Sequence, residues 1–180
     1  MMFMNAIQPI WALTLALTLY AGWIDWRTHR IPNWLTVPSL FLGVALHSWS
    51  TGWRGALLSL EGAGLALIVL LPLVLMRALG AGDWKLMGAV GAFLGPWMFL
   101  FVLLVSVLVS GLMAMVQMVR TNRVKETICN LVVLVQGFFA FGLRIHPEIS
   151  LDNPGLLRLP FGVAAAVGTL IIFIAARWVS

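Results

Sequence analysis

The chain has 180 residues, of which 62% are hydrophobic and 9% are charged, and its mean hydropathy is +1.02. These values exclude an ordinary soluble domain, in which about a quarter of the residues are charged. Lys and Arg outnumber Asp and Glu by 11 to 6, but the basic residues lie at the ends of apolar runs, where they orient helices and contact membrane lipids. We therefore expect an all-α integral membrane protein, a polytopic helical bundle with residues 1–180 as one domain, and no nucleic-acid partner.

The sequence lacks the signals of several other classes. Its single cysteine, Cys129, excludes an intrachain disulfide and a cysteine-built zinc site. Neither the His-Glu-x-x-His pattern of zinc proteases nor the Gly-x-Ser-x-Gly pattern of serine hydrolases occurs. We expect neither a metal nor a cofactor. No Lys or Arg precedes the first apolar run, so we expect it to be retained and not cleaved as a signal peptide.

The first apolar run, residues 6–24, carries no charge. At about 1.5 Å per residue, a helix of this length crosses a hydrocarbon core of about 30 Å. Arg27 and Arg30 follow the run, and no basic residue precedes it. Because basic residues are enriched on the cytoplasmic side, we expect residues 25–33 in the cytoplasm and the N-terminus outside.

Two further spans are expected next. Pro32 predicts a break, because proline cannot donate the helical hydrogen bond and disfavours a helical residue before it. A second span is expected over residues 34–49, which leads to an external turn. A third, over residues 56–76, returns the chain to the cytoplasm at Arg77.

The uncharged stretch at residues 86–119 is too long for one crossing and fits two that are joined tightly. We expect the hinge at Gly95-Pro96, where proline interrupts the helical hydrogen bonds. Small residues four positions apart let a neighbouring helix approach closely. The first limb carries two such pairs, Gly91 with Gly95 and Gly88 with Ala92.

The last third of the chain leaves two topologies open. Arg120, Arg123 and Lys125 mark a cytoplasmic return, and the last span is expected over residues 159–179. Residues 128–142 are apolar but short, so they form either an interfacial helix or an extra crossing. We expect the interfacial helix, which gives about six spans in total, against about seven with the crossing.

Three acidic residues lie near or within the expected spans, namely Asp25, Glu61 and Asp83. The topology places Asp25 and Asp83 at the same cytoplasmic face. Two close carboxylates share one proton, as aspartic hydrolysis requires. One then acts as the base that activates water, and the other as the acid that stabilises the carbonyl oxygen. In the plainer interpretation, both acids merely mark the ends of loops.

The local sequence suggests which acid holds the shared proton. Gly80 and Gly82 form a flexible lead into a helix that begins near Asp83, where the positive end of the helix dipole favours the Asp83 anion. Asp25 lies at the negative C-terminal end of the first span. We therefore expect the proton on Asp25, as one microstate of a coupled pair.

Two segments resemble the signatures of type IV prepilin peptidases. The first is residues 25–36, DWRTHRIPNWLT, and the second is residues 80–86, GAGDWKL. The short chain is similar to the branch of that family that processes Flp (tight-adherence) pilins. Residues 159–164, LPFGVA, resemble the family motif at the start of the last span. The resemblance covers about residues 10–178.

The resemblance implies an aspartic endopeptidase embedded in the inner (cytoplasmic) membrane of a bacterium or archaeon. Asp25 and Asp83 match the family's catalytic pair, which removes a short leader from prepilins or pseudopilins just ahead of their hydrophobic segment. Larger relatives also methylate the new N-terminus and carry paired cysteines in an added region. This chain has neither the added region nor the paired cysteines, so we do not expect methyltransferase activity.

Several residues near the two acids are expected to support the site or to bind substrate: Lys85, Asn33, Pro32, Gly80, Gly82 and Pro160. Lys85 has an alternative as a side chain that reaches the lipid headgroups. Trp84 stands where the family has a smaller aliphatic residue, and we expect it to anchor at the membrane interface. Glu61 is expected to be neutral or paired, with His47 as an available partner.

The competing hypothesis is a non-enzymatic membrane subunit or a carrier of protons or small solutes. Its glycines would serve helix packing, and its acids would form a path for protons or cations. Replacing either Asp25 or Asp83 separates the two hypotheses, because a carrier would leave the processing of a prepilin unchanged.

Overall fold

The computed structural model describes residues 2–121 and 160–179, and all the regular structure in these ranges is helical. The helices are α1 (Met2–Thr28), α2 (Asn33–Thr51), α3 (Trp53–Leu75), α4 (Ala81–Arg120) and α6 (Phe161–Val179). The prediction of an all-helical chain is confirmed for this part. The interfacial helix expected over residues 128–142 lies outside the described residues.

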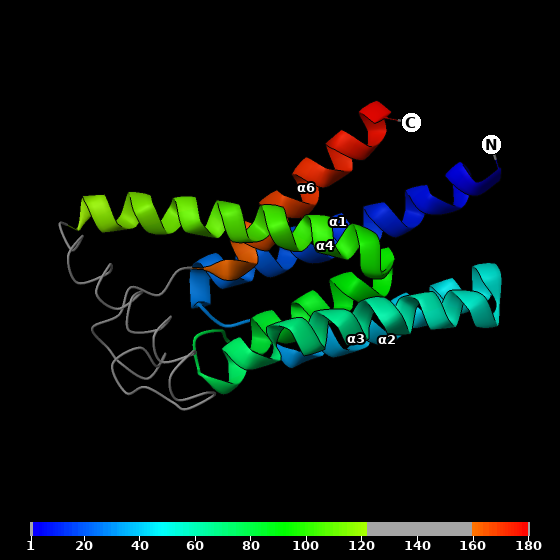
Figure 1. The fold of residues 1–180 in the computed structure, drawn as a ribbon, viewed down its shortest axis with the longest axis horizontal. Helices are drawn as coiled ribbons and strands as arrows, with labels where there is room; N and C mark the ends of the chain where they lie inside the picture. The colour runs from blue at the N-terminus through cyan, green and yellow to red at the C-terminus, as the bar shows by residue number, and fades with distance from the viewer. Residues whose placement is uncertain (1, 122–159, 180) are drawn as a thin grey trace.

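The helices lie along a common direction, with α4 at the centre. Figure 1 shows α1 beside α6 and α2 beside α3, and α4 contacts each of these four helices. Helices α3, α4 and α6 are long and apolar enough to cross a membrane. This supports a helical membrane protein, whereas six spans and the expected orientation stay predictions.

The predicted break before α2 is present. Pro32 has φ −74° and ψ 143°, an extended conformation, and α2 begins at the next residue. The preceding helix α1 ends at Thr28, and the next residue, His29, has φ 49° and donates its backbone N–H to the Asp25 carbonyl oxygen at 2.8 Å. The left-handed residue and the extended proline together turn the chain from α1 into α2.

The predicted hinge in α4 is also present. Gly95 has φ 72° and ψ 176°, outside the helical region, and Figure 1 shows α4 turning back along the bundle. Pro96 has no N–H, so the Ala92 carbonyl loses its helical partner. The Ser59 hydroxyl donates to this carbonyl at 2.7 Å.

A second side chain meets a backbone carbonyl beside the hinge. His47 on α2 places its Nε2 atom 2.8 Å from the Phe93 carbonyl oxygen. Buried carbonyls need hydrogen-bond donors, and here α2 and α3 provide them. We call the part of the bundle around Gly95 the kink end, and the opposite part, which carries Asp25 and Asp83, the Asp end.

Helices α3 and α4 approach each other through glycines. A Cβ atom on Gly62 would collide with the Gly91 carbonyl, and one on Gly91 would collide with the Gly62 backbone. The small-residue pairs predicted on α4 therefore do serve helix packing. The core beside them includes fully buried large side chains, among them Leu86, Met87, Phe93, Phe99 and Val102.

Candidate functional site

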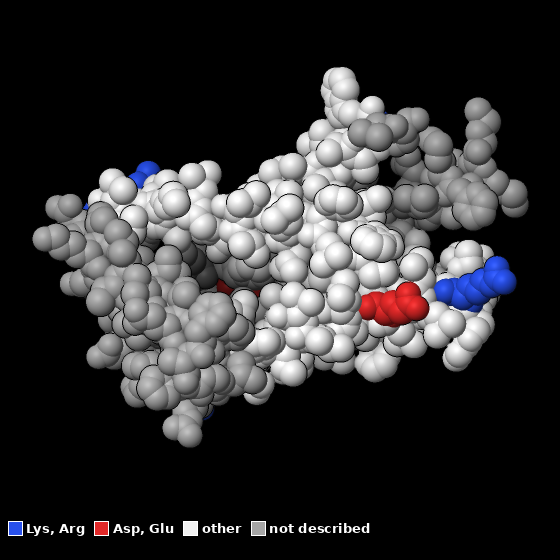
Figure 2. Space-filling view, in the orientation of Figure 1, with Lys and Arg blue, Asp and Glu red and all other residues white. Residues whose placement is uncertain are grey.

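Two carboxylates lie together at the Asp end. Asp25 is in the last turn of α1 and is buried, with 4% of its surface exposed. Asp83 is in the first turn of α4 and is half-buried. The two are close enough for the charge on Asp25 to act on Asp83. Figure 2 shows acidic atoms inside a hollow of the surface on this side of the molecule.

The Asp25 carboxylate is held by helix α6. The backbone N–H of Gly162 donates to Asp25 Oδ2 at 2.8 Å, and both groups are buried. Gly162 is in the first turn of α6, directly after the buried Pro160 and the half-buried Phe161. The N-terminus of a helix favours negative charge. A Cβ atom on Gly162 would lie 2.9 Å from Asp25 Cβ, so glycine is needed for this contact.

The Asp83 carboxylate has one backbone donor, and one of its two oxygens lacks a hydrogen-bond partner among the described residues. The backbone N–H of Gly80, just before α4, hydrogen-bonds to it. A Cβ atom on Gly80 would lie 2.8 Å from Asp83 Oδ2. Asp83 Oδ1 is buried and has no hydrogen-bond partner among the described residues. Because a buried oxygen without a partner is costly, Oδ1 is available to a water molecule or a substrate.

Ile31 connects the surroundings of the two acids. A Cβ atom on Gly82, beside Asp83, would lie 2.9 Å from the Ile31 carbonyl oxygen. One on Gly162 would lie 3.1 Å from Ile31 Cδ1. The sequence interpretation treated Ile31 only as a break and did not single out Gly162 within its motif. The signal for Ile31 was the extended conformation that Pro32 imposes on it.

A polar contact joins α4 to the start of α2. Lys85 Nζ donates to Asn33 Oδ1 at 2.9 Å in an exposed position. Both residues were expected near the acids. In the sequence, Lys85 follows Asp83 by two residues and Asn33 follows Pro32 directly. The contact ties together the two segments that carry the family signatures.

Two expectations at other residues need correction. Trp84 was expected to anchor at the membrane interface, but its indole Nε1 donates to the Leu67 carbonyl oxygen at 2.8 Å and the side chain is half-buried against α3. His47 was named as a partner for Glu61, but it contacts Phe93, and Glu61 is exposed. The His47 imidazole therefore contacts the Phe93 carbonyl oxygen and not the Glu61 carboxylate.

The chemistry available at the Asp end is that of the two carboxylates. Among the described residues, no group of three or more His, Cys, Asp or Glu side chains is placed to hold a metal ion. Two close carboxylates, each with a backbone donor and one with an oxygen that has no partner among the described residues, can activate a water molecule and protonate a carbonyl oxygen.

Comparison with known proteins identifies the family. Residues 12–116 match the model of the type IV leader peptidase family. This match covers more than half of the 180 residues. The chain belongs to the type IV leader peptidase family. Searches of curated proteins and of solved structures gave no significant match.

The family match agrees with the site's position in the sequence. Asp25 and Asp83 lie inside the matched range, whereas Gly162 lies beyond it. The part of the chain that the family model covers thus supplies both carboxylates. The backbone donor to Asp25 comes from outside that part.

Proposed function

We propose that this member of the type IV leader peptidase family is an aspartic endopeptidase that removes the leader of Flp-type prepilins, with Asp25 and Asp83 as its catalytic pair. One observation carries the proposal. Two carboxylates from helices far apart in sequence meet at one end of the bundle, each with a backbone N–H donor, and one oxygen of Asp83 is buried without a partner among the described residues. That is the arrangement a water-activating dyad needs.

The hydrogen bonds suggest a division of roles. Both carboxylates accept a backbone N–H, but only Asp83 also has a buried oxygen that lacks a donor among the described residues, which disfavours its charged form. We therefore assign the resting proton to Asp83. This reverses the assignment made from the sequence, where α6 could not be seen beside Asp25 and the end of α1 was the nearest helix terminus.

The reaction then follows in two steps. Asp25 takes a proton from water as the water oxygen bonds to the scissile carbonyl carbon, and the Asp83 proton moves to the carbonyl oxygen. The tetrahedral intermediate next loses its C–N bond. Asp25 gives its proton to the leaving nitrogen, and one hydroxyl of the intermediate returns a proton to Asp83. Both acids regain their starting states, and no cofactor is consumed.

The remaining residues act as supports of the pair. Gly80, Gly82 and Pro160 shape the backbone around the two carboxylates, and Pro32 sets the extended conformation next to them. Lys85 and Asn33 hold α4 against the start of α2. We propose that the Asp end faces the cytoplasm of a cell with an inner membrane, since the basic residues gather there.

The test is leader removal from a co-expressed Flp prepilin. Asp25→Asn and Asp83→Asn should each lower the rate by at least about a thousandfold, the upper range for removal of a catalytic acid or base. Glu61→Gln is the matched control, because it also neutralises an acid on a helix but lies away from the pair. Unchanged processing in either Asn variant, with normal folding, would show a carrier or subunit and overturn the proposal.

A further inference from the structure

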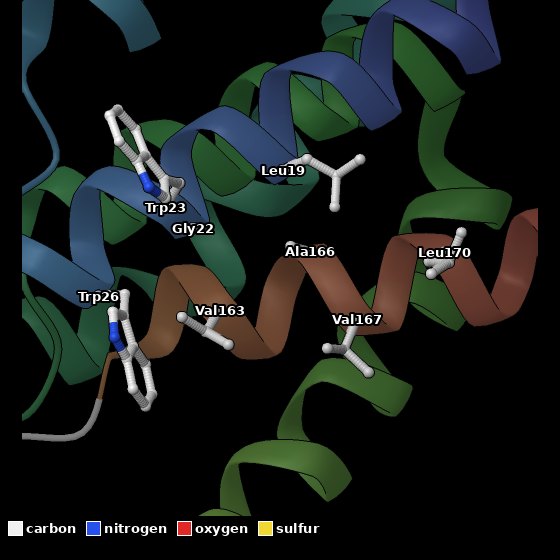
Figure 3. Close-up of a pocket in the computed structure, with 8 residues that line it drawn as sticks. All are labelled: Leu19, Gly22, Trp23, Trp26, Val163, Ala166, Val167 and Leu170. Carbon is white, nitrogen blue, oxygen red and sulfur yellow. The ribbon is translucent and has the colours of Figure 1, made fainter.

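A groove runs between α1 and α6, the helix that ends near Asp25 and the helix whose Gly162 holds it. It has a volume of about 330 Å³ and is shown in Figure 3. Its lining is apolar and comes from two helices only: Leu19, Gly22, Trp23 and Trp26 of α1, and Val163, Ala166, Val167 and Leu170 of α6.

The lining residues have the spacing of a helix-binding surface. On each helix they stand at positions i, i+3, i+4 and i+7, which is one face of two successive turns, about 10 Å long. Small residues form the floor, since a Cβ atom on Gly22 would lie 3.2 Å from Ala166 Cβ. Larger side chains, including Leu19 and Val167, stand up as walls with 51% and 38% of their surface exposed.

The floor of the groove reaches Gly162, the residue that holds Asp25. A Cβ atom on Gly22 would lie 3.0 Å from the Gly162 carbonyl oxygen, and the N–H of this same Gly162 holds Asp25. The groove ends at Trp26, the neighbour of Asp25 in sequence. A chain lying in the groove therefore arrives beside Asp25.

The surface changes character on the other side of Trp26. A second cavity of about 630 Å³ begins there, and Trp26 lines both. Its lining is mixed, with the polar side chains of His29, Gln117 and Arg120 beside apolar side chains of α4, whereas the groove lining is apolar. An occupant that is apolar in the groove and polar beyond Trp26 would match both surfaces.

We propose that the α1–α6 groove binds the apolar helical segment that follows the cleaved bond in the substrate. This inference rests on the proposed function. An apolar segment at membrane depth is helical, because an extended one leaves its backbone unpaired. Small residues at the floor let such a helix approach closely. The peptide that precedes it then passes Trp26 next to Asp25 and enters the second cavity.

Photo-crosslinking tests the occupant directly. A photoreactive residue is placed at 167, at 19 or, as the control, at the exposed Ile68 of α3, in the Asp83→Asn background so that a Flp prepilin stays intact. We expect crosslinks to the prepilin's apolar segment from positions 167 and 19 at least fivefold above those from 68. Equal yields at the three positions, or lipid adducts alone at 167 and 19, would overturn the proposal.

Kinetics on the membrane-bound prepilin provide the second measurement. Val167→Trp and Leu19→Trp fill the groove from opposite walls and should each raise KM about tenfold with kcat within twofold. Ile68→Trp should change neither constant. An unchanged KM in both groove variants, or a fall in kcat alone, would overturn the proposed role of the groove in substrate binding. The peptidase proposal would remain intact. Failure of the unmodified protein to cut the prepilin would instead overturn the proposed function, and this inference with it.

Discussion

The two ends of the bundle treat buried polar groups in opposite ways. At the kink end, the turn in α4 exposes backbone carbonyls, and Ser59 and His47 reach from neighbouring helices to meet them. At the Asp end, the buried Asp83 Oδ1 has no partner among the described residues. At the kink end both carbonyls have donors, whereas at the Asp end one oxygen of the candidate pair has none among the described residues.

Thr36 fits the same contrast. Its hydroxyl is the other buried side-chain atom without a partner in the described part of the chain, and it lies in the first turn of α2, at the Asp end. Both buried atoms without partners in the described residues thus lie at the end of the molecule that carries the proposed catalytic pair. The difference teaches that, in the described residues, unsatisfied buried groups gather at the end that carries the candidate site.

The largest expected effect comes from closing the glycine contact between α3 and α4. Gly91→Ala places a methyl group against the Gly62 backbone and should cost about 3 kcal/mol of folding free energy, as overpacking does. Thermal unfolding in detergent measures it. Gly111→Ala on the same helix meets nothing within 4 Å and should be neutral. Equal stability of the two variants would contradict the close approach.

The next largest effect is expected at Gly162. Gly162→Ala pushes a methyl group onto Asp25 and should lower kcat about a hundredfold, equivalent to about 2.7 kcal/mol of activation free energy. Folding should change much less than in Gly91→Ala. Cleavage assays on the purified protein, paired with unfolding curves, check this. A variant that loses stability but keeps kcat would place Gly162 with the structural glycines instead.

A smaller effect is expected at the kink end from Ser59→Ala. Losing the donor leaves the Ala92 carbonyl buried and unpaired, which costs about 2 kcal/mol of stability. Ser106→Ala is the matched control, because the Ser106 hydroxyl is equally buried but donates within its own helix, to Val102. We expect Ser59→Ala to lower the unfolding temperature and to leave kcat unchanged, which would confirm that the kink end serves structure. A fall in kcat without a loss of stability would contradict the structural role of Ser59.

The smallest effect is expected where the Asp end is exposed. Lys85→Met removes the contact to Asn33 and should lower kcat/KM about threefold to tenfold. Asn33→Ala should have a similar effect, and the double variant should be no worse than either one, since contacting residues are not additive. Fully additive losses would show that the two side chains act separately.

Sequence reasoning reached the features that depend on local chemistry. Pro96 lacks an N–H wherever it stands, so the hinge at Gly95 could be predicted, and the apolar runs predicted the described helices. The identity of the two acids came from motif resemblance and from counting spans. These inferences need no knowledge of which helix lies beside which.

The rest depends on contacts between distant segments. The donor to Asp25 lies 137 residues away in sequence, and no local pattern connects the two. His47 was paired with Glu61 because the carbonyl it actually meets belongs to another helix. Trp84 likewise finds its acceptor on α3. Each error came from assigning a side chain to lipid or to a nearby charge before its packing partner was known.

The dependence of Asp25 on α6 has a consequence for synthesis. A ribosome releases α1 and α4 well before α6, so a nascent or truncated chain ending before residue 160 has both acids and lacks the Gly162 amide that holds Asp25. Hydrolytic competence would then be acquired last, when the final helix inserts. Unfinished copies would leave the surrounding membrane proteins uncut.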